Sequence, residues 1–143
     1  MTQKSTSSQE KREDSKYEVL SRDLITRILG TVAYDKAFFF YADVGKPTGD
    51  FAVSLSDLCN KINSVAPKSL NFHLKRGDFE NWIREVINDH ELAGRVKKLR
   101  SLKGTYRSDS TLKRKLNTVI EDRVAELQDL WRHALTWPES VIA

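Results

Sequence analysis

The segment Phe72–Ile83 contains a helix stop directly followed by a helix start, and this constrains the fold more than any other part of the chain. Gly77 is a typical helix-ending residue, and two cations precede it in what would be the last helical turn. Asp78 is placed to cap the next helix. The stripe of that helix follows helical spacing at every step and consists of Phe79, Trp82, Ile83, Val86 and Ile87. Two helices meeting at a sharp corner favour a helical bundle.

Apolar residues recur at helical spacing in several other segments. Start signals support two of these helices: Ser15 with Glu18 three residues later, and Ser54 with Asp57. Asp89 can cap a third. The pattern predicts helices over about 17–32 and 55–64, from Pro67 to Gly77, from Asp78 through the stripe above, from Asp89 to before Gly104, and over about 109–133. We therefore expect a mainly α-helical fold, a compact bundle of about five helices.

The stretch 37–53 interrupts the helical pattern. Four adjacent aromatic residues, Phe38 to Tyr41, precede a Gly/Pro-rich stretch, and Phe51-Ala52-Val53 follows it. Aromatic and β-branched runs on either side of such a loop predict a short β-hairpin near 38–53, although adjacent aromatics could also end a buried helix.

The composition bounds the class of protein. The chain has 143 residues, enough for one domain with a sizeable core. Residues 1–15 have no large apolar residue after Met1, which predicts a disordered polar tail, and we expect a helical domain over 16–135 and a C-terminal tail over 136–143. No apolar run approaches the roughly 18 residues that a membrane helix needs. The single cysteine, Cys59, lies in an apolar stripe, so we expect a buried residue and a cytoplasmic protein.

Positive charge is concentrated in one segment. Residues 95–115 contain nine basic residues against one acidic residue, whereas the whole chain has a net charge of only +4. This basic segment comprises Arg95, Lys97, Lys98, Arg100, Lys103, Arg107, Lys113, Arg114 and Lys115. Such a segment is typical of a surface that meets nucleic-acid phosphates or an acidic partner, and the alternative is a solvated helix end.

A second candidate site is the polar cluster at the helix corner, formed by His73, Arg76, Asp78 and Glu80. Such a cluster suits acid-base chemistry. The alternative is structural: Asp78 caps a helix, Arg76 suits the end of the preceding helix, and Glu80 suits the first turn of the next one. A half-buried His73, bonded to a carbonyl group or to Asp78, would complete a purely structural interpretation. We assign no catalytic residue.

The sequence indicates no cofactor and no metal site. Its three histidines, His73, His90 and His133, are widely separated, and one cysteine adds little to them.

The last predicted helix has a broad apolar stripe that Trp131 extends, and Trp137, Val141 and Ile142 continue the apolar character. If part of this surface is exposed, it marks an interface with a partner protein or a second copy of the chain. Docking back onto the same domain is the alternative.

The stretch from about Phe38 to Leu127 resembles a family of small prokaryotic domains, largely archaeal, whose function is unknown. The features that carry the resemblance are Phe38 to Tyr41, Thr48-Gly49, Ser69 with Phe72-His73, Asp78-Phe79 with Trp82-Ile83, Asp89 with Leu92-Ala93, and Arg123 with Leu127. The family pattern has a longer stretch between the histidine and the Asp-Phe pair, here compressed to Leu74–Gly77. The resemblance implies a shared fold and no particular activity.

Three functions follow from these features. The first is a non-enzymatic cytosolic protein-interaction or regulatory domain, acting through the basic segment or the C-terminal helix. The second is a nucleic-acid-binding accessory protein that uses the basic segment, with little sequence selectivity. The third is a small enzyme centred on His73. No membrane partner is expected.

Overall fold

The computed structural model describes residues 21–101 and 109–142, and the side chains among them except that of Asp109 and those after His133. Most of this part of the chain is helical, with two strands in one antiparallel hairpin, so the predicted fold class is confirmed. In chain order the elements are α2 (Arg22–Leu29), a 3-10 turn η1 (Tyr34–Lys36), β1 (Phe38–Asp43), β2 (Lys46–Ala52), α3 (Leu55–Ser64), α4 (Pro67–Arg76), α5 (Asp78–Trp82), a π-helical turn η2 (Ile83–Ile87), α6 (His90–Ser101) and α7 (Asp109–Ile142).

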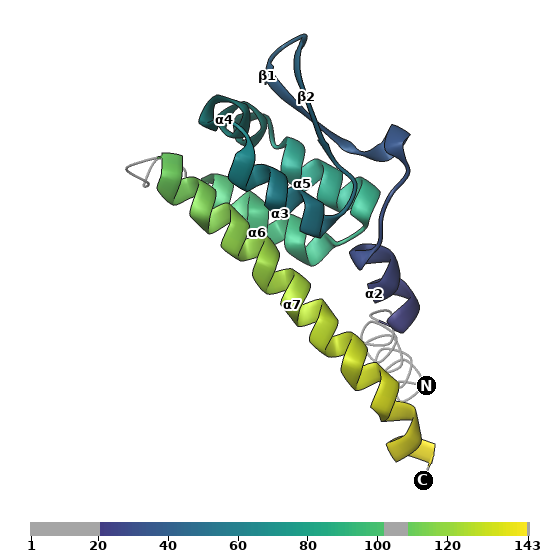
Figure 1. Cartoon of the computed structure of the whole chain (residues 1–143). Helices are drawn as coiled ribbons and strands as arrows, with labels where there is room; N and C mark the ends of the chain where they lie inside the picture. The colour runs from purple at the N-terminus through teal and green to yellow at the C-terminus, as the bar shows by residue number, and fades with distance from the viewer. Residues whose placement is uncertain (1–20, 102–108, 143) are drawn as a thin grey trace, which may run out of the picture.

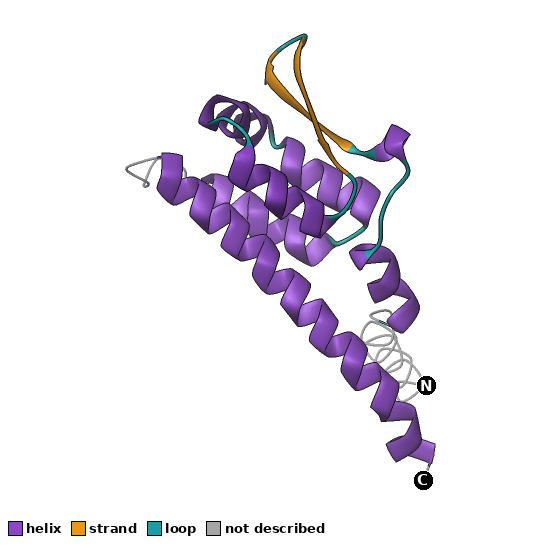
Figure 2. Cartoon of the chain, in the orientation of Figure 1, coloured by secondary structure: helices purple, strands orange, loops and turns teal. Residues whose placement is uncertain are grey.

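Helix α7 is the longest element and organises the others. Its 34 residues correspond to a length of about 51 Å. Helices α3, α4 and α6 contact its N-terminal half, and α2 lies beside its more C-terminal part (Figure 1). The hairpin projects from the side of the helical body that faces away from α7, as the colouring by secondary structure shows (Figure 2).

The helix boundaries differ from the predicted ones at both ends of the chain. Helix α7 was expected to end near 133, but its backbone stays helical to Ile142. Pro138 removes one backbone donor without ending the helix. At the other end, α2 stops at Leu29, where Gly30 donates its N–H to the carbonyl of Arg27. The predicted start signal at Ser15 lies outside the described residues.

The hairpin is confirmed, and the helical alternative for 38–53 is wrong. Its turn consists of Val44 and Gly45 only, so most of the Gly/Pro-rich stretch belongs to β2. The pairing is irregular, with register shifts on both sides of Tyr41. Phe38 and Phe40 point into the core, whereas Phe39 packs on the outer side against Tyr34 and Phe51.

Local start and stop signals explain most of the other boundaries. The Ser54 hydroxyl accepts the Asp57 N–H at the start of α3, at 3.0 Å. Pro67 occupies the first turn of α4, and Gly77 ends that helix in the left-handed conformation, with φ +72°. At the start of α6, the Asp89 carboxylate accepts the Leu92 N–H at 3.3 Å, as predicted.

The core lies between the hairpin, α3–α6 and the inner face of α7. Phe38 is at its centre, stacked on Phe79 with ring centroids 4.9 Å apart and edge-on to Trp82. The Trp82 indole N–H donates to the Lys36 carbonyl at 2.8 Å, which ties α5 to the start of the hairpin. The predicted stripe of α3 is buried and consists of Leu55, Leu58, Cys59 and Ile62. In the predicted stripe of α7, Leu112, Leu116, Ile120 and Leu127 are buried, and Val119, Val124 and Trp131 are partly buried.

Candidate functional site

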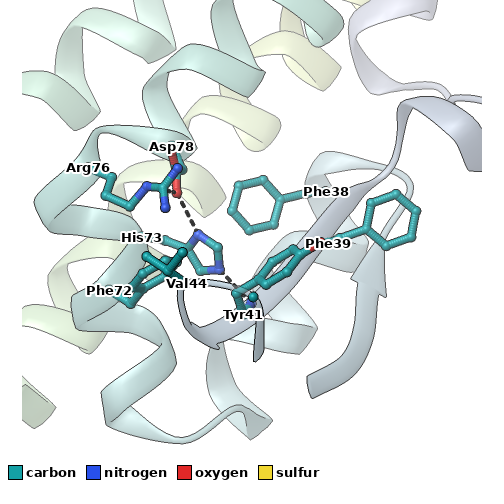
Figure 3. A pocket seen from close by; sticks show the side chains of 9 residues that line it. Phe38, Phe39, Tyr41, Val44, Phe72, His73, Arg76 and Asp78 are labelled. Atoms are coloured by element: carbon teal, nitrogen blue, oxygen red, sulfur yellow. Dashed lines mark hydrogen bonds and ion pairs between the residues drawn. The ribbon is translucent and has the colours of Figure 1, made fainter. Parts of the chain in front are cut away.

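The corner between α4 and α5 holds His73 against the hairpin. Its side chain is almost fully buried, with 2% of the residue exposed. Nδ1 lies 2.8 Å from the Asp78 carboxylate, and Nε2 accepts the Tyr41 backbone N–H at 2.8 Å (Figure 3). Ser69, one helical turn before His73, donates its hydroxyl to the Tyr41 carbonyl at 2.8 Å. Ser69 and His73 of α4 thus bind the backbone carbonyl and N–H of Tyr41, at the outer edge of β1.

These contacts define the tautomer of His73. A backbone N–H can only donate, so Nε2 must be unprotonated, and Nδ1 therefore carries the proton that is donated to Asp78. Burial lowers the pKa of His73 below its usual value, and the hydrogen bond to Asp78 opposes this shift without cancelling it. The ring is thus a neutral, two-sided hydrogen-bonding group. It can act as a general base or a ligand only by losing its bond to Tyr41.

A pocket of about 470 Å³ lies beside His73, between the hairpin and α4 (Figure 3). Its walls are mainly aromatic, and its polar groups are the His73 ring, the Asp78 carboxylate and the Arg76 guanidinium. Two contacts orient the Arg76 guanidinium. Its Nε lies 3.4 Å from the Asp78 carboxylate, and its central carbon lies over the Phe72 ring, 4.9 Å from the ring centroid. The three polar side chains mainly bind one another, which favours a structural role for this part of the predicted polar cluster.

Asp78 does not cap α5, contrary to the prediction. It is the first residue of that helix, Gly77 takes the capping position, and no side-chain capping bond forms. The carboxylate instead turns back toward α4, where it accepts from His73 and Arg76. The N–H groups of neutral His73 and of cationic Arg76 thus take the place of the backbone N–H groups that a capping carboxylate would bind.

Glu80, the fourth member of the predicted cluster, is separated from His73 and packs on the other side of the corner. It lies in the first turn of α5, as the sequence predicted, and is 3% exposed. Its Oε1 lies 2.6 Å from Nε of Arg100 on α6. A Cβ atom at Gly77 would approach this oxygen to 2.6 Å, so any other residue there would displace the Glu80 carboxylate and also strain the backbone at positive φ. The structure thus divides the predicted cluster into two ion-pair sites.

The basic segment is also divided. Arg95 binds Glu126 of α7 with two hydrogen bonds, of 2.7 and 3.0 Å, and binds Glu91 at 3.1 Å. These bonds raise the pKa of Arg95 and lower that of Glu126, in each case mainly through the hydrogen bond between them. Arg100 is paired with Glu80, as described above.

The remaining cations of the segment have different environments. Lys113 donates to the Asn63 carbonyl at 2.7 Å, and Lys115 also interacts within the chain. Lys97, Lys98 and Arg114 are exposed. Lys103 and Arg107 lie outside the described residues. The nine cations therefore do not act as one open surface, because at least three hold helices together.

The sequence marked the apolar surface of α7 around Trp131 as a candidate interface, but not the groove that this surface forms with α2. The groove has a volume of about 660 Å³ and is mainly apolar, with Leu29 and Trp131 as its hydrophobic walls. Trp131 is fixed by a hydrogen bond of 3.1 Å from its indole N–H to Thr26, and the Arg22 guanidinium lies over its ring at 5.8 Å. Trp131 thus packs against its own domain, which was the alternative for this apolar surface, while a groove stays open beside it. The side chains of Trp137, Val141 and Ile142 lie outside the described part.

Leu130, the residue before Trp131 on α7, is also exposed, by 41%. The sequence signal for this surface is the broad apolar stripe of α7 that Trp131 extends. The α2 wall of the groove depends on how α2 packs beside α7, which the stripe itself does not encode.

Three further features of the described residues bear on function: metal ligands, helices that could span a membrane, and thiols. They contain no group of three or more His, Cys, Asp or Glu side chains placed to hold a metal ion. None of the helices that they form is long and apolar enough to cross a membrane. Cys59 is buried, and this burial raises the pKa of its thiol to about 12, with a smaller contribution from Glu121, so the thiol is a poor nucleophile.

Comparisons with known proteins identify no relative: no protein-family model, no curated protein and no solved structure matches the chain.

Proposed function

We propose that this chain is a protein-interaction domain that binds a helical segment of a partner protein in the groove between α2 and α7. The observation that supports this proposal is the groove itself, apolar and about 660 Å³ in volume, on the part of α7 that extends past the body. Two helices that lie side by side form a furrow that a third helix can fill, and amphipathic helices commonly bind in such furrows.

The groove suits an interface because its apolar wall is held in place before a partner arrives. The Trp131 ring is fixed by Thr26 and by Arg22, so little conformational entropy is lost on binding. Tryptophan and arginine are also the residues most often found to dominate binding energy at interfaces.

Site-directed photo-crosslinking in the native cell tests this proposal. A photo-reactive residue is introduced in place of Gln128, which lines the groove, and in a control variant in place of Lys97, on the exposed face of α6. We expect a discrete crosslinked protein from the Gln128 position and none from the Lys97 position. Adding Leu29→Glu, which places a charge in the apolar wall, should abolish the product. Crosslinking from Lys97 alone, or from neither position, would contradict the proposal.

Nucleic-acid binding is the second candidate function, and one observation favours it. Lys97, Lys98 and Arg114 are exposed, and they lie on the two helices that the segment 102–108 connects. Three open cations support weak, salt-sensitive binding to phosphates. The groove is favoured over this surface because the other described cations of the basic segment interact within the chain.

A further inference from the structure

The charges around the α2–α7 groove restrict the chemistry of its partner. Two cations flank Trp131: Arg22 lies over its ring, and Arg132 lines the groove beside it. None of the described residues that line the groove is acidic. Among the described residues, Asp23 on α2 and Asp129 on α7 are not part of the lining.

We infer that the groove takes an amphipathic helix whose apolar face is flanked by carboxylates. This inference rests on the proposed function and deepens it. Leucine-type side chains of the partner fill the apolar space between Leu29 and Trp131, and Asp or Glu side chains at the edge of its apolar face approach Arg22 and Arg132. A helix with lysines at those positions brings like charges together next to a low-dielectric wall.

Apart from Arg132, the described lining of the groove is uncharged. Gly30 lines the groove at the point where α2 ends. The uncharged Gln128 lies on the opposite wall. The preference for acidic groups therefore comes from the two cations near Trp131, and the rest of the groove favours apolar side chains of the partner.

Two synthetic peptides test this inference against the full-length protein. Both are about 15 residues long and have the same leucine stripe, and they differ only in having Glu or Lys beside that stripe. Fluorescence anisotropy of the labelled peptides gives both affinities. We expect the Glu peptide to bind about tenfold more tightly at low ionic strength, and the difference to shrink as salt is added.

Charge reversal locates the effect. Arg132→Glu should remove or invert the tenfold preference, whereas Arg27→Glu, an equal change of charge on an α2 residue outside the lining, should preserve it. Equal affinities, tighter binding of the Lys peptide, or the same response in both variants would overturn the inference and leave the proposed function standing if Gln128 still crosslinks.

Two outcomes separate failure of the inference from failure of the function. If neither peptide binds and Gln128 gives no crosslink, both are wrong. If sedimentation shows that the protein self-associates and Leu29→Glu abolishes this, the occupant is a second copy, and the inferred partner class is wrong.

Discussion

Arg123 of α7 and Asp89 at the start of α6 form a buried, two-pronged ion pair. Nε of Arg123 lies 2.8 Å from Oδ2 of Asp89, and one terminal guanidinium nitrogen lies 3.0 Å from Oδ1. The two residues are 4% and 2% exposed. Arg123 also contacts Glu126 at 3.2 Å, and Glu126 binds Arg95, so a chain of alternating charges fastens α6 to α7.

The buried pair predicts a large loss of stability when one partner is removed. In Asp89→Asn and Arg123→Met the remaining residue keeps a buried polar group without its partner, and we expect the free energy of unfolding to fall by about 3–5 kcal/mol. Urea denaturation measures this. The double variant should lose less than the sum of the two single losses. Strictly additive losses would mean that the pair is not coupled.

The exposed neighbour of that pair should behave differently. Arg95 and Glu126 lie in water-accessible positions, so a double-mutant cycle with Arg95→Gln and Glu126→Gln should give a coupling of only about 0.2–1 kcal/mol. Raising the salt concentration should reduce that coupling, because the Debye length shortens. A salt-independent coupling would indicate that this pair is shielded from solvent.

Gly77→Ala should destabilise the protein more than Gly45→Ala. Both glycines have a positive φ, +72° and +71°, so each substitution costs about 1–2 kcal/mol for the left-handed backbone. The two sites differ in space. A Cβ at Gly77 meets Glu80 at 2.6 Å, whereas one at Gly45 meets nothing within 4 Å. Displacing Glu80 from Arg100 should add roughly 2 kcal/mol. Equal costs in urea denaturation would show that Glu80 moves freely.

The burial and hydrogen bonds of His73 predict a loss of stability in mild acid. The pKa of His73 is lowered in the folded protein, so the unfolded chain binds its proton first as the pH falls. This contribution to stability is complete above the usual pKa of 6.5 and decreases below it. Between pH 7.5 and 5.5, the loss from this residue should reach up to about 1.4 kcal/mol.

A variant without the ionisable ring isolates this effect. His73→Gln has a neutral side chain whose oxygen can accept the Tyr41 N–H, while His90, His133, Asp78 and Arg76 are unchanged. Its stability should therefore vary less between pH 7.5 and 5.5 than that of the parent protein. If the two proteins lose stability in parallel, His73 does not titrate in the way that its contacts require.

The sequence was sufficient for features that local chemistry determines. Helical spacing, the glycine stop at Gly77 and the cap at Asp89 predicted their helices because each depends on residues within a few positions. The capping role predicted for Asp78 is wrong, whereas the bond to His73 that the sequence also suggested does form, because two interactions competed for one carboxylate. A capping position and a partner on the preceding helix look alike in sequence, and only the fold brings His73 within 2.8 Å.

The long-range pairs could not be predicted in the same way. Arg123 did give a signal, since it is a charged residue between Ile120 and Leu127 on an apolar stripe, and such a residue needs a buried partner. Nothing in the sequence selects Asp89 as that partner. The basic segment shows the same limit: helical geometry directs Arg95, Arg100 and Lys113 toward three different partners, and the density of charge in the sequence does not indicate them.

This division of the basic segment predicts how any nucleic-acid binding should depend on salt. Each cation that neutralises a phosphate contributes about 0.9 to the slope of log affinity against log salt concentration. Replacing Lys97, Lys98 and Arg114 together with glutamine should therefore reduce the slope by about 2.7 for duplex DNA, because these side chains are exposed. Arg95→Gln should leave the slope unchanged, since Glu126 already neutralises that guanidinium. Anisotropy titrations across a salt series measure both variants. An equal decrease in slope from Arg95→Gln would mean that the ion pair opens on binding, and no binding by the parent protein at low salt would eliminate nucleic acid as a partner.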